Sequence, residues 1–399
     1  MSSGPSPVKR PTISDVARAA AVSKATVSAV LNDVPGVRES TRERVRTAME
    51  LLNYRPARAH VGRVAGRETA AAAAMIALVI KEHDNPYYAA IVDGVRGVLE
   101  PEGHTLIIVS TGGDLAAERR AVTRLHAAGI DGFIVTPVLG QDGDLSHFFE
   151  LRRRNVPLVL LERVRGLPAS LVDVDNVEIS RAAVEHLIGL GHTRIAHLAG
   201  PPYSMHSRER IDGVRRAFSA SRLMLRDEDL VPAGAHLEDG YRAGLARFGG
   251  RPDEERPTAV TCYNDLVAIG LCRALAELGL RVPEDVSVVG YDGIPLCDFL
   301  SVPLTTVQVP MQEMGVQSAR LLLRILTAHA AVPPERVSLE ASLVVRASTA
   351  APRTDAARGE SPRAEGVRPA AVVPPGTPTP GAGTRTSPRA AGRRTAVGH

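Results

Sequence analysis

The stretch TISDVARAAAVSKATVSAVLN, residues 12–32, has the pattern that decides the fold of the N-terminal part of the chain. Its apolar residues recur at helical spacing in two short runs, and Ala21 and Val22 form a tight link between the runs. Thr12 and Ser23 stand directly before these runs, where helices favour a side chain that accepts a backbone N–H bond. The stretch therefore predicts two short helices joined by a tight turn.

A third short helix is predicted after a loop that contains Pro35 and Gly36. Ser40 and Glu43 have the spacing of a capping box, and apolar residues recur at helical spacing after them. Three such helices are typical of a helix-turn-helix, in which the second helix enters the major groove of DNA. The alternative is a small helical cap whose charges form a solvated face.

Charge is distributed unevenly along the 399 residues. Residues 1–67 have a net charge of +7, residues 351–399 have +5, and the segment between them has −8. A basic head on an acidic body indicates that the head, and not the body, meets a polyanion. The charge therefore favours the DNA-binding interpretation of the three helices.

From Met75 onward, short apolar runs alternate with amphipathic helical stretches. The alternation predicts strands over residues 75–80, 105–109, 131–136, 157–161, 194–198, 258–262 and 286–290, and helices over residues 86–100, 114–128, 176–190, 206–220 and 263–279. Repeated alternation of this kind is typical of parallel sheets covered by helices on both faces. Because the body is longer than one ordinary doubly wound sheet, we expect an α/β core of two subdomains with a cleft between them.

The composition argues against several classes of protein. No GxSxG, P-loop, HExxH or zinc-like Cys/His spacing occurs, so we expect neither an enzyme nor a bound metal or cofactor. The three cysteines form no CxxC pair, and their odd number argues against a disulfide framework. The longest apolar run, residues 70–80, is too short to span a bilayer, and the first residues lack the apolar segment of a secretory signal. We therefore expect a cytoplasmic protein that does not contact a membrane.

Motifs of one known family occur in order along the chain. They include TISDVARAAAVSKATVSAVLN and VRESTRERVRTAMELLNYRP in the head, and AVEHLIGLGHTRIAHLAGP, TAVTCYNDLVAIG and RVPEDVSVVGYDGIPLCDFLSVPLTTV in the body. In these motifs the chain resembles the lactose-repressor (LacI/GalR) family, over roughly residues 12–348. The resemblance implies a homodimeric repressor or activator that is controlled by a small-molecule effector. It also implies a core with the periplasmic-binding-protein fold.

The resemblance and the composition together predict five segments. Residues 351–399 contain 8 Pro and 7 Gly without periodicity, which is typical of a disordered tail. We expect a disordered start (1–11), a helix-turn-helix DNA-binding domain (12–56), a hinge or linker (57–74), a ligand-binding and dimerisation core (75–348) and a disordered tail (349–399).

The resemblance also implies which residues contact DNA. It places the base-reading positions of the second helix at Lys24, Ala25, Ser28 and Ala29. Lysine suits guanine and alanine suits a thymine methyl, so we expect Lys24 to provide most of the direct readout. The family inserts a leucine between base steps at the position of Arg63, so an apolar wedge here would be Val64. Further contacts to phosphate or the minor groove are expected from Thr12, Ser23, Thr26, Asn32, Thr41, Tyr54, Arg58 and Arg63.

Candidate effector residues follow from the strand ends, because ligands of open α/β sheets bind beyond the carboxyl ends of the strands. These candidates are Tyr87, Thr136, Glu162, Arg208, Arg210, Asn264 and Asp292. In the family, the positions of Arg210, Asn264 and Asp292 bond sugar hydroxyls or a purine. His236 lies near a position that often holds a ring-stacking aromatic residue.

Some of these positions also have a structural interpretation. Tyr87 could stack on a ligand ring or simply pack in the core. Glu162 is equally well explained as an exposed turn acid paired with Arg163. Asp265, next to Asn264, is better explained as a helix N-cap than as a ligand contact.

We therefore expect a transcriptional repressor that binds double-stranded palindromic DNA as a homodimer and responds to a sugar. Nucleosides and purines remain alternative effectors, since they are bound by similar sets of polar residues. A pure solute receptor and an enzyme with a DNA-binding appendage are the competing functions.

Overall fold

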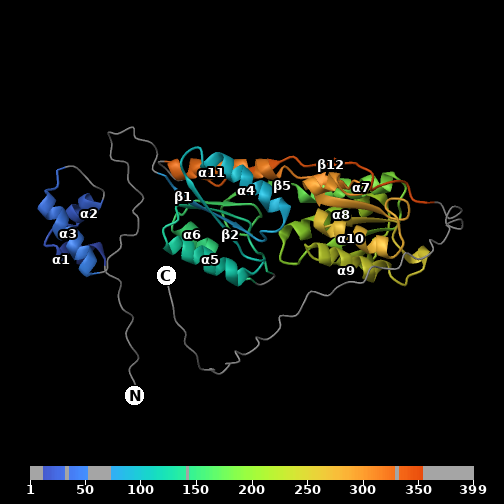
Figure 1. The fold of residues 1–399 in the computed structure, drawn as a ribbon, viewed down its shortest axis with the longest axis horizontal. Coiled ribbons are helices and arrows are strands. Elements are labelled where there is room, and N and C mark those ends of the chain that lie inside the picture. Colours follow the sequence, from blue (N-terminus) through green and yellow to red (C-terminus); the bar gives the residue numbers. More distant parts are fainter. Residues whose placement is uncertain (1–11, 32–35, 53–72, 141–142, 329–331, 354–399) are drawn as a thin grey trace, which may run out of the picture. The chain divides into compact units, whose positions relative to one another are not determined.

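The computed structural model describes residues 12–31, 36–52, 73–140, 143–328 and 332–353. They form a helical head and an α/β core of two lobes (Figure 1). The head contains α1 (Ile13–Ala19), α2 (Lys24–Leu31) and α3 (Glu39–Leu51). The first lobe contains β1 (Met75–Ile80), α4 (Pro86–Leu99), β2 (Thr105–Ser110), α5 (Leu115–Ala127), β3 (Gly132–Val135), α6 (Ser146–Arg153), β4 (Leu158–Leu160), β5 (Ser170–Val174), α11 (Met311–Thr327) and β11 (Arg336–Leu339). The second lobe contains α7 (Asn176–Gly189), β6 (Ile195–Ala199), α8 (Met205–Ser221), β7 (Leu230–Pro232), α9 (Leu237–Phe248), β8 (Ala259–Cys262), α10 (Asp265–Glu277), β9 (Ser287–Asp292), β10 (Thr305–Gln308), β12 (Ser342–Val344) and the 3₁₀ turns η1 (Asp227–Asp229), η2 (Asp253–Glu255) and η3 (Pro295–Asp298).

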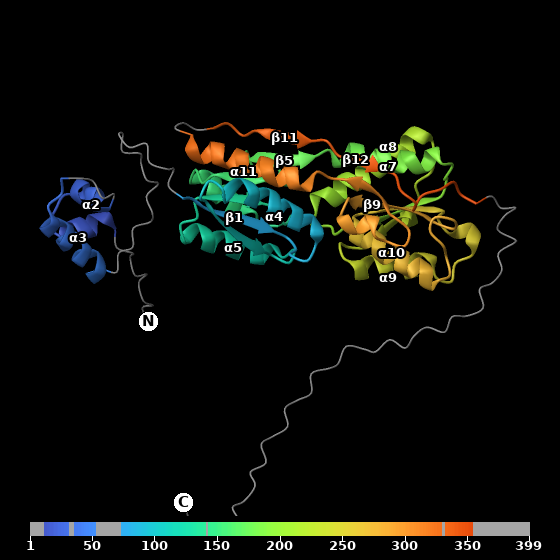
Figure 2. The same cartoon turned by 45° about the horizontal axis from the view of Figure 1, so that its top comes forward.

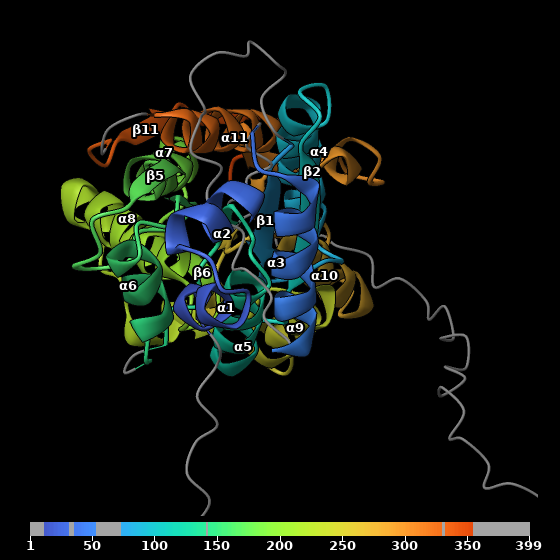
Figure 3. The same cartoon turned by 90° about the vertical axis from the view of Figure 1, so that its left-hand side faces the viewer.

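The three helices of the head are seen in Figure 3. They are held by hydrogen bonds at their ends and by a small apolar core. The Thr12 backbone N–H and Oγ1 both donate to the Asp15 carboxylate, at 2.9 and 2.7 Å, and the Ser23 Oγ accepts from the Thr26 backbone N–H at 3.0 Å. The link between α1 and α2 places Ala21 in the left-handed region, with φ 51°. The predicted helix starts at Thr12 and Ser23 are therefore confirmed.

The predicted capping box at Ser40 is wrong. The carbonyl of Arg38 accepts the backbone N–H groups of Thr41 and Arg42, at 2.9 and 3.1 Å, so α3 begins at Glu39. Ser40 consequently lies inside the first turn of the helix instead of preceding it.

The first lobe is a parallel sheet in the order β11-β5-β4-β3-β1-β2. Helices α4 and α11 cover one face and α5 and α6 the other (Figure 1). α4 and α11 approach closely because both have glycine at their contact. A Cβ on Gly94 would lie 2.0 Å from the Gln312 carbonyl oxygen, and one on Gly315 would lie 2.2 Å from the Ile91 carbonyl oxygen.

The second lobe is a sheet in the order β12-β10-β9-β8-β6-β7, parallel except for β12. Helices α7 and α8 pack on one face, and α9 and α10 on the other (Figure 1). The chain passes between the lobes after β5, after β10 and after β11, and Figure 2 shows β5 and β11 side by side. Since the chain crosses between the lobes three times, each time at the end of a strand, strand ends of both sheets lie where the lobes meet.

Every strand and helix predicted for the body forms, with small shifts at its ends. The sequence patterns missed β5, β7, β10, β11, β12, α6, α9 and α11. Asp173 interrupts the apolar run of β5, β10 is a polar TTVQ segment, and β7 and β12 are three-residue edge strands. These strands are stabilised by their sheet neighbours and lack a strong local signal.

The packed core also continues beyond residue 348, where the tail was predicted to begin. The Ala350 backbone N–H donates to Ser287 Oγ at 3.0 Å, and Arg353 pairs with Asp285 at 2.8 Å. The remaining segment boundaries stay predictions. Within the described ranges, none of the helices has the length and apolar character needed to cross a membrane.

Candidate functional site

The recognition helix α2 exposes its N-terminal end. Lys24 and Ala25 are exposed, Ser28 and Ala29 are half-buried, and Val27 is fully buried against α1 and α3. This helix therefore presents its predicted base-reading positions away from the core of the head. Asn32, Tyr54, Arg58, Arg63 and Val64 lie outside the described residues.

Three of the hydroxyl groups predicted to contact phosphate already have partners within the head. Ser23 Oγ and Thr26 Oγ1 lie 2.8 Å apart, in addition to the Ser23 bond to the Thr26 backbone N–H. The Thr12 hydroxyl is held by Asp15. Thr41 is half-buried in the first turn of α3. A phosphate contact by Thr12, Ser23 or Thr26 would thus add to a helix-capping role that the structure shows.

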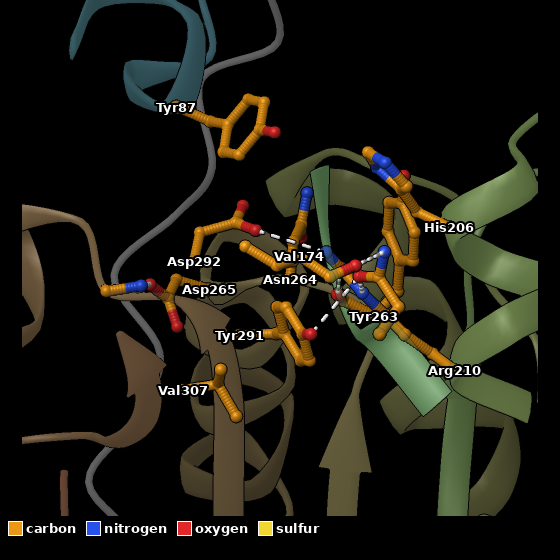
Figure 4. Close-up of polar contacts among 12 residues, drawn as sticks. Tyr87, Val174, His206, Arg210, Tyr263, Asn264, Asp265, Tyr291, Asp292 and Val307 are labelled. Carbon is orange, nitrogen blue, oxygen red and sulfur yellow. Dashed lines mark hydrogen bonds and ion pairs between the residues drawn. The ribbon is translucent and has the colours of Figure 1, made fainter. Parts of the chain in front are cut away.

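A pocket lies where the two lobes meet (Figure 4). Its lining is mostly polar and aromatic and consists of Lys81, Glu82, Asn85, Tyr87, Tyr88, Pro201, Tyr203, His206, Arg210, Ala235, Tyr263, Asn264 and Asp292. Among the predicted effector residues, it brings together Tyr87, Arg210, Asn264 and Asp292. Its free volume is about 20 Å³, room for one or two water molecules.

Arg210, on α8, is the most constrained charge in this pocket. Its guanidinium lies 3.4 Å from the centre of the Tyr291 ring and 4.9 Å from that of Tyr263. Its Nε donates to Asn176 Oδ1 at 3.2 Å, and another nitrogen donates to the Tyr263 carbonyl. These contacts hold a buried guanidinium in one orientation facing Asp292, 3.6 Å away.

Asp292 ends β9 in a strained backbone conformation. Its φ is 114°, in the left-handed region that non-glycine residues rarely adopt. Burial raises the pKa of its carboxyl well above the usual range, although Arg210 acts in the opposite direction. Backbone strain and a buried carboxyl at a strand end are both features that gather at functional sites.

Asp265 holds the turn that directly follows Asp292. Its carboxylate accepts from the Gly293 and Ile294 backbone N–H groups, at 2.7 and 2.8 Å, and from Thr306 Oγ1 at 2.5 Å. Burial raises the pKa of Asp265 to about 6. The prediction that Asp265 is the N-cap of its helix is wrong, because Asn264 Oδ1 accepts from the Val267 backbone N–H at 2.8 Å.

Asn264 therefore has a structural role in addition to its position in the pocket. Its Nδ2 donates to the Ala235 carbonyl at 2.9 Å, so both polar atoms of the side chain have partners. Of the three positions that the family resemblance emphasised, Arg210 and Asp292 are better placed than Asn264 to exchange a contact with a ligand.

Glu162 lies beneath the pocket and does not line it. Its carboxylate pairs with Lys81, accepts from the Met205 backbone N–H at 3.1 Å and lies 3.6 Å from His206 Nδ1. Burial raises the pKa of Glu162, but His206, Lys81 and the Met205 N–H outweigh burial and hold it below the usual range. Burial lowers the pKa of His206 to about 4, so this histidine is uncharged at neutral pH. Pairing of an exposed Glu162 with Arg163, the alternative interpretation, is excluded because Glu162 is buried.

Like Glu162, three further predicted effector residues lie outside the pocket lining. Thr136 is buried at the end of β3, and its Oγ1 has no partner among the described residues. Arg208 donates to the carbonyl of Pro202, in the loop that precedes α8, at 3.0 Å. His236 precedes α9 with an exposed ring, whose Nε2 lies 3.8 Å from Glu82 Oε1.

Sequence reasoning missed several lining residues that simple rules would have found. Lys81 and Glu82 directly follow β1 and so obey the strand-end rule. His206 precedes Arg210 by four residues on α8, and therefore lies on the same face of that helix. Tyr203 lies in the loop before α8, where no periodic signal marks its direction.

Comparison with known proteins identifies the family of the head and of the core. Residues 12–57 match the family of bacterial regulatory proteins, lacI family, and residues 184–349 match a periplasmic binding protein-like domain. The HTH-type transcriptional repressor PurR of Vibrio vulnificus is 34% identical over 322 residues, which cover 78% of this chain and 91% of that protein.

Solved structures show the same fold. The transcriptional regulator CelR in complex with cellobiose is 33% identical with a TM-score of 0.62, and the match covers 85% of this chain and all of that one. The lac repressor dimer bound to operator and the anti-inducer ONPF is 28% identical with a TM-score of 0.61, covering 86% of this chain and all of that one. The chain belongs to the LacI family and is a DNA-binding transcriptional regulator, not an enzyme.

Proposed function

We propose that this regulator is a homodimeric repressor whose affinity for a palindromic operator is set by a sugar bound between the two lobes. The main supporting observation is the pocket, in which Arg210 and Asp292 of one lobe face Tyr87 of the other (Figure 4). Guanidinium and carboxylate groups suit vicinal hydroxyls, and aromatic side chains suit the faces of a sugar ring. CelR, which shares the fold and a third of its sequence, binds cellobiose.

The contacts between the lobes support a switch. The Met205 N–H donates to Glu162 at 3.1 Å, and the Leu139 N–H donates to the Tyr203 carbonyl at 2.9 Å, each across the lobe boundary. A sugar does not fit into about 20 Å³, so we infer that the lobes separate to admit it and close again around it. Such a ligand shifts the lobe equilibrium only as far as its affinities for the two arrangements differ.

An apolar surface near the pocket supports a dimer. Phe299 is 83% exposed and Leu296 is 47% exposed, both in or next to η3. An exposed aromatic residue beside a second apolar side chain is typical of a protein interface. Phe299 follows Asp292 by only seven positions in the chain, so a movement of Asp292 on ligand binding would be passed to this surface through a short segment. A two-fold dimer would match the two half-sites of a palindrome.

Selection of binding sites from random duplex DNA tests the proposal. The selected duplexes are expected to be palindromic, and light scattering is expected to show a dimer. Titration of the best duplex complex with cellobiose, glucose and ribose is expected to change DNA affinity at least about tenfold for one sugar, the range of ordinary allosteric coupling. Selection of non-palindromic sites, or DNA affinity that no sugar changes, would contradict it.

A further inference from the structure

The positive charges of the pocket are already paired with carboxyl groups, and this pairing limits which ligands the pocket can bind. Lys81 and Arg210 are the lining residues that carry positive charge at neutral pH, since His206 is uncharged. Lys81 pairs with Glu162, and the two side chains are 4% and 1% exposed. Arg210 faces Asp292, and those side chains are 4% and 7% exposed. Each buried cation therefore already has its own buried carboxyl partner.

Glu82 adds a carboxylate that no such pair balances. It lies at the end of β1, lines the pocket and is 8% exposed. In the described part of the chain, no lysine or arginine forms an ion pair with it, and the basic side chain within ion-pair range is His236, at 3.8 Å. The two cations, Lys81 and Arg210, stand against the carboxyl groups of Glu82, Asp292 and Glu162. If Asp292 is ionised, the net charge of these five groups is negative, and if Asp292 is protonated it is zero. The pocket therefore has no excess of positive charge in either state.

Binding of a phosphorylated ligand to a pocket with these charges would be unfavourable. A phosphate monoester brings nearly two negative charges at neutral pH and requires unpaired donors or cations. To supply one, Lys81 would have to leave Glu162, or Arg210 would have to leave Asp292, and a buried charge would lose its partner. Arg208, the nearest other arginine of α8, points to the Pro202 carbonyl.

We propose that the pocket takes uncharged polyhydroxylated sugars and rejects their phosphorylated forms, with Glu82 as the residue that enforces the rejection. This inference rests on the proposed function of the pocket as a sugar site. The Glu82 carboxylate accepts hydrogen bonds from ligand hydroxyls and repels a phosphate in the same space.

Matched pairs of sugars test this. Calorimetric titration compares cellobiose with 6-phosphocellobiose, glucose with glucose 6-phosphate, and ribose with ribose 5-phosphate, on the full chain. For the sugar that binds, the phosphorylated partner is expected to bind at least about 100-fold more weakly, since an unpaired buried charge costs that much or more. A phosphorylated sugar that binds as tightly as its neutral partner would overturn the inference and leave the sugar site standing. No binding by either member of any pair would count against the proposed function as well.

A variant isolates the part played by Glu82. Glu82→Gln keeps the shape of the side chain and removes its charge. It is expected to reduce the ratio of the two dissociation constants, phosphorylated sugar over neutral sugar, about tenfold. Glu102→Gln, at a site whose side chain is 59% exposed, is the matched control and is expected to leave the ratio unchanged. A ratio that Glu82→Gln leaves unchanged, with a normal thermal melt, would overturn the role of Glu82.

Discussion

The head and the pocket use polar side chains in opposite ways. In the head, Lys24 is exposed at the start of α2, and the hydroxyls around it close helix ends. In the pocket, Arg210 and Lys81 are almost completely buried. Arg210 pairs with Asp292, and Lys81 pairs with Glu162, a buried residue outside the lining. The head can therefore bind DNA with little change of its own contacts, whereas the pocket has to exchange existing contacts for those of a ligand. This difference explains why one region suits recognition and the other suits a switch.

The largest expected effect is the loss of a buried charge. Arg210→Ala removes the partner of Asp292 and is expected to lower the free energy of unfolding by about 3–5 kcal/mol. Arg215→Ala, on the same helix but exposed, is expected to change it by less than about 0.5 kcal/mol. Urea unfolding of both variants measures the difference. Equal losses would show that Arg210 is not held as tightly as its contacts indicate.

Removing the exposed charge of Lys24 is expected to change DNA recognition and leave the stability of the head unchanged. Lys24→Ala is expected to reduce discrimination at one base pair of each half-site by about 1–3 kcal/mol. Its thermal melt is expected to match the wild type because Lys24 is exposed. Competition binding with single-base variants of the selected operator is the measurement. An equal loss of affinity for operator and random DNA would make Lys24 a phosphate contact.

A smaller effect is expected for a helix cap. Ser23→Ala removes the acceptor of the Thr26 backbone N–H and is expected to cost the head about 1 kcal/mol of stability. Thr47→Ala, at an exposed position inside α3, is the control. Hydrogen exchange of the α2 amides reports the stability of this helix alone. Unchanged protection of α2 in Ser23→Ala would contradict the capping role.

The smallest expected effect is a pH dependence near the pocket. Burial raises the pKa of Glu209 to about 7, and Asn176, which also holds Arg210, donates to it at 3.0 Å. Because the pKa is higher in the folded state, that state binds more protons between pH 4.5 and 7, and its stability falls as pH rises through this window. In the wild type, the titration of Glu209 is expected to lower Tm by roughly 2–4 °C as the pH rises through this window. Glu209→Gln is expected to remove this decrease in Tm.

Thermal melts at several pH values check this, with Glu284→Gln at an exposed site as the control. A slope that is the same in Glu209→Gln and the wild type would show that Glu209 titrates normally. The comparison between variants is needed because other buried groups, including Asp265 and His197, also titrate abnormally in the folded state.

The same contrast explains what the sequence could predict. Helix starts at Thr12 and Ser23 were predictable because capping is a local interaction between residues two or three apart. The alternation of strands and helices was predictable for the same reason. The partners of pocket residues were not, since Arg210 meets Asn176, Tyr263 and Tyr291 from three other segments of the chain.

Asn264 and Asp265 show this limit most clearly. Both follow β8 and both have side chains suited to a helix N-cap, and the sequence favoured the wrong one. Asp265 instead accepts hydrogen bonds from the backbone N–H groups of Gly293 and Ile294, which directly follow the neighbouring strand β9. No pattern along the chain marks a contact between residues so far apart.

The central claim is that Asp292 couples a sugar in the pocket to DNA binding by the head. The direct test is the operator affinity of the wild type and of Asp292→Asn, each measured with and without the sugar that the titrations identify. The wild type is expected to change its operator affinity at least about tenfold with sugar, and Asp292→Asn is expected to bind operator normally and respond to no sugar. An Asp292→Asn protein that responds to sugar like the wild type would contradict the account.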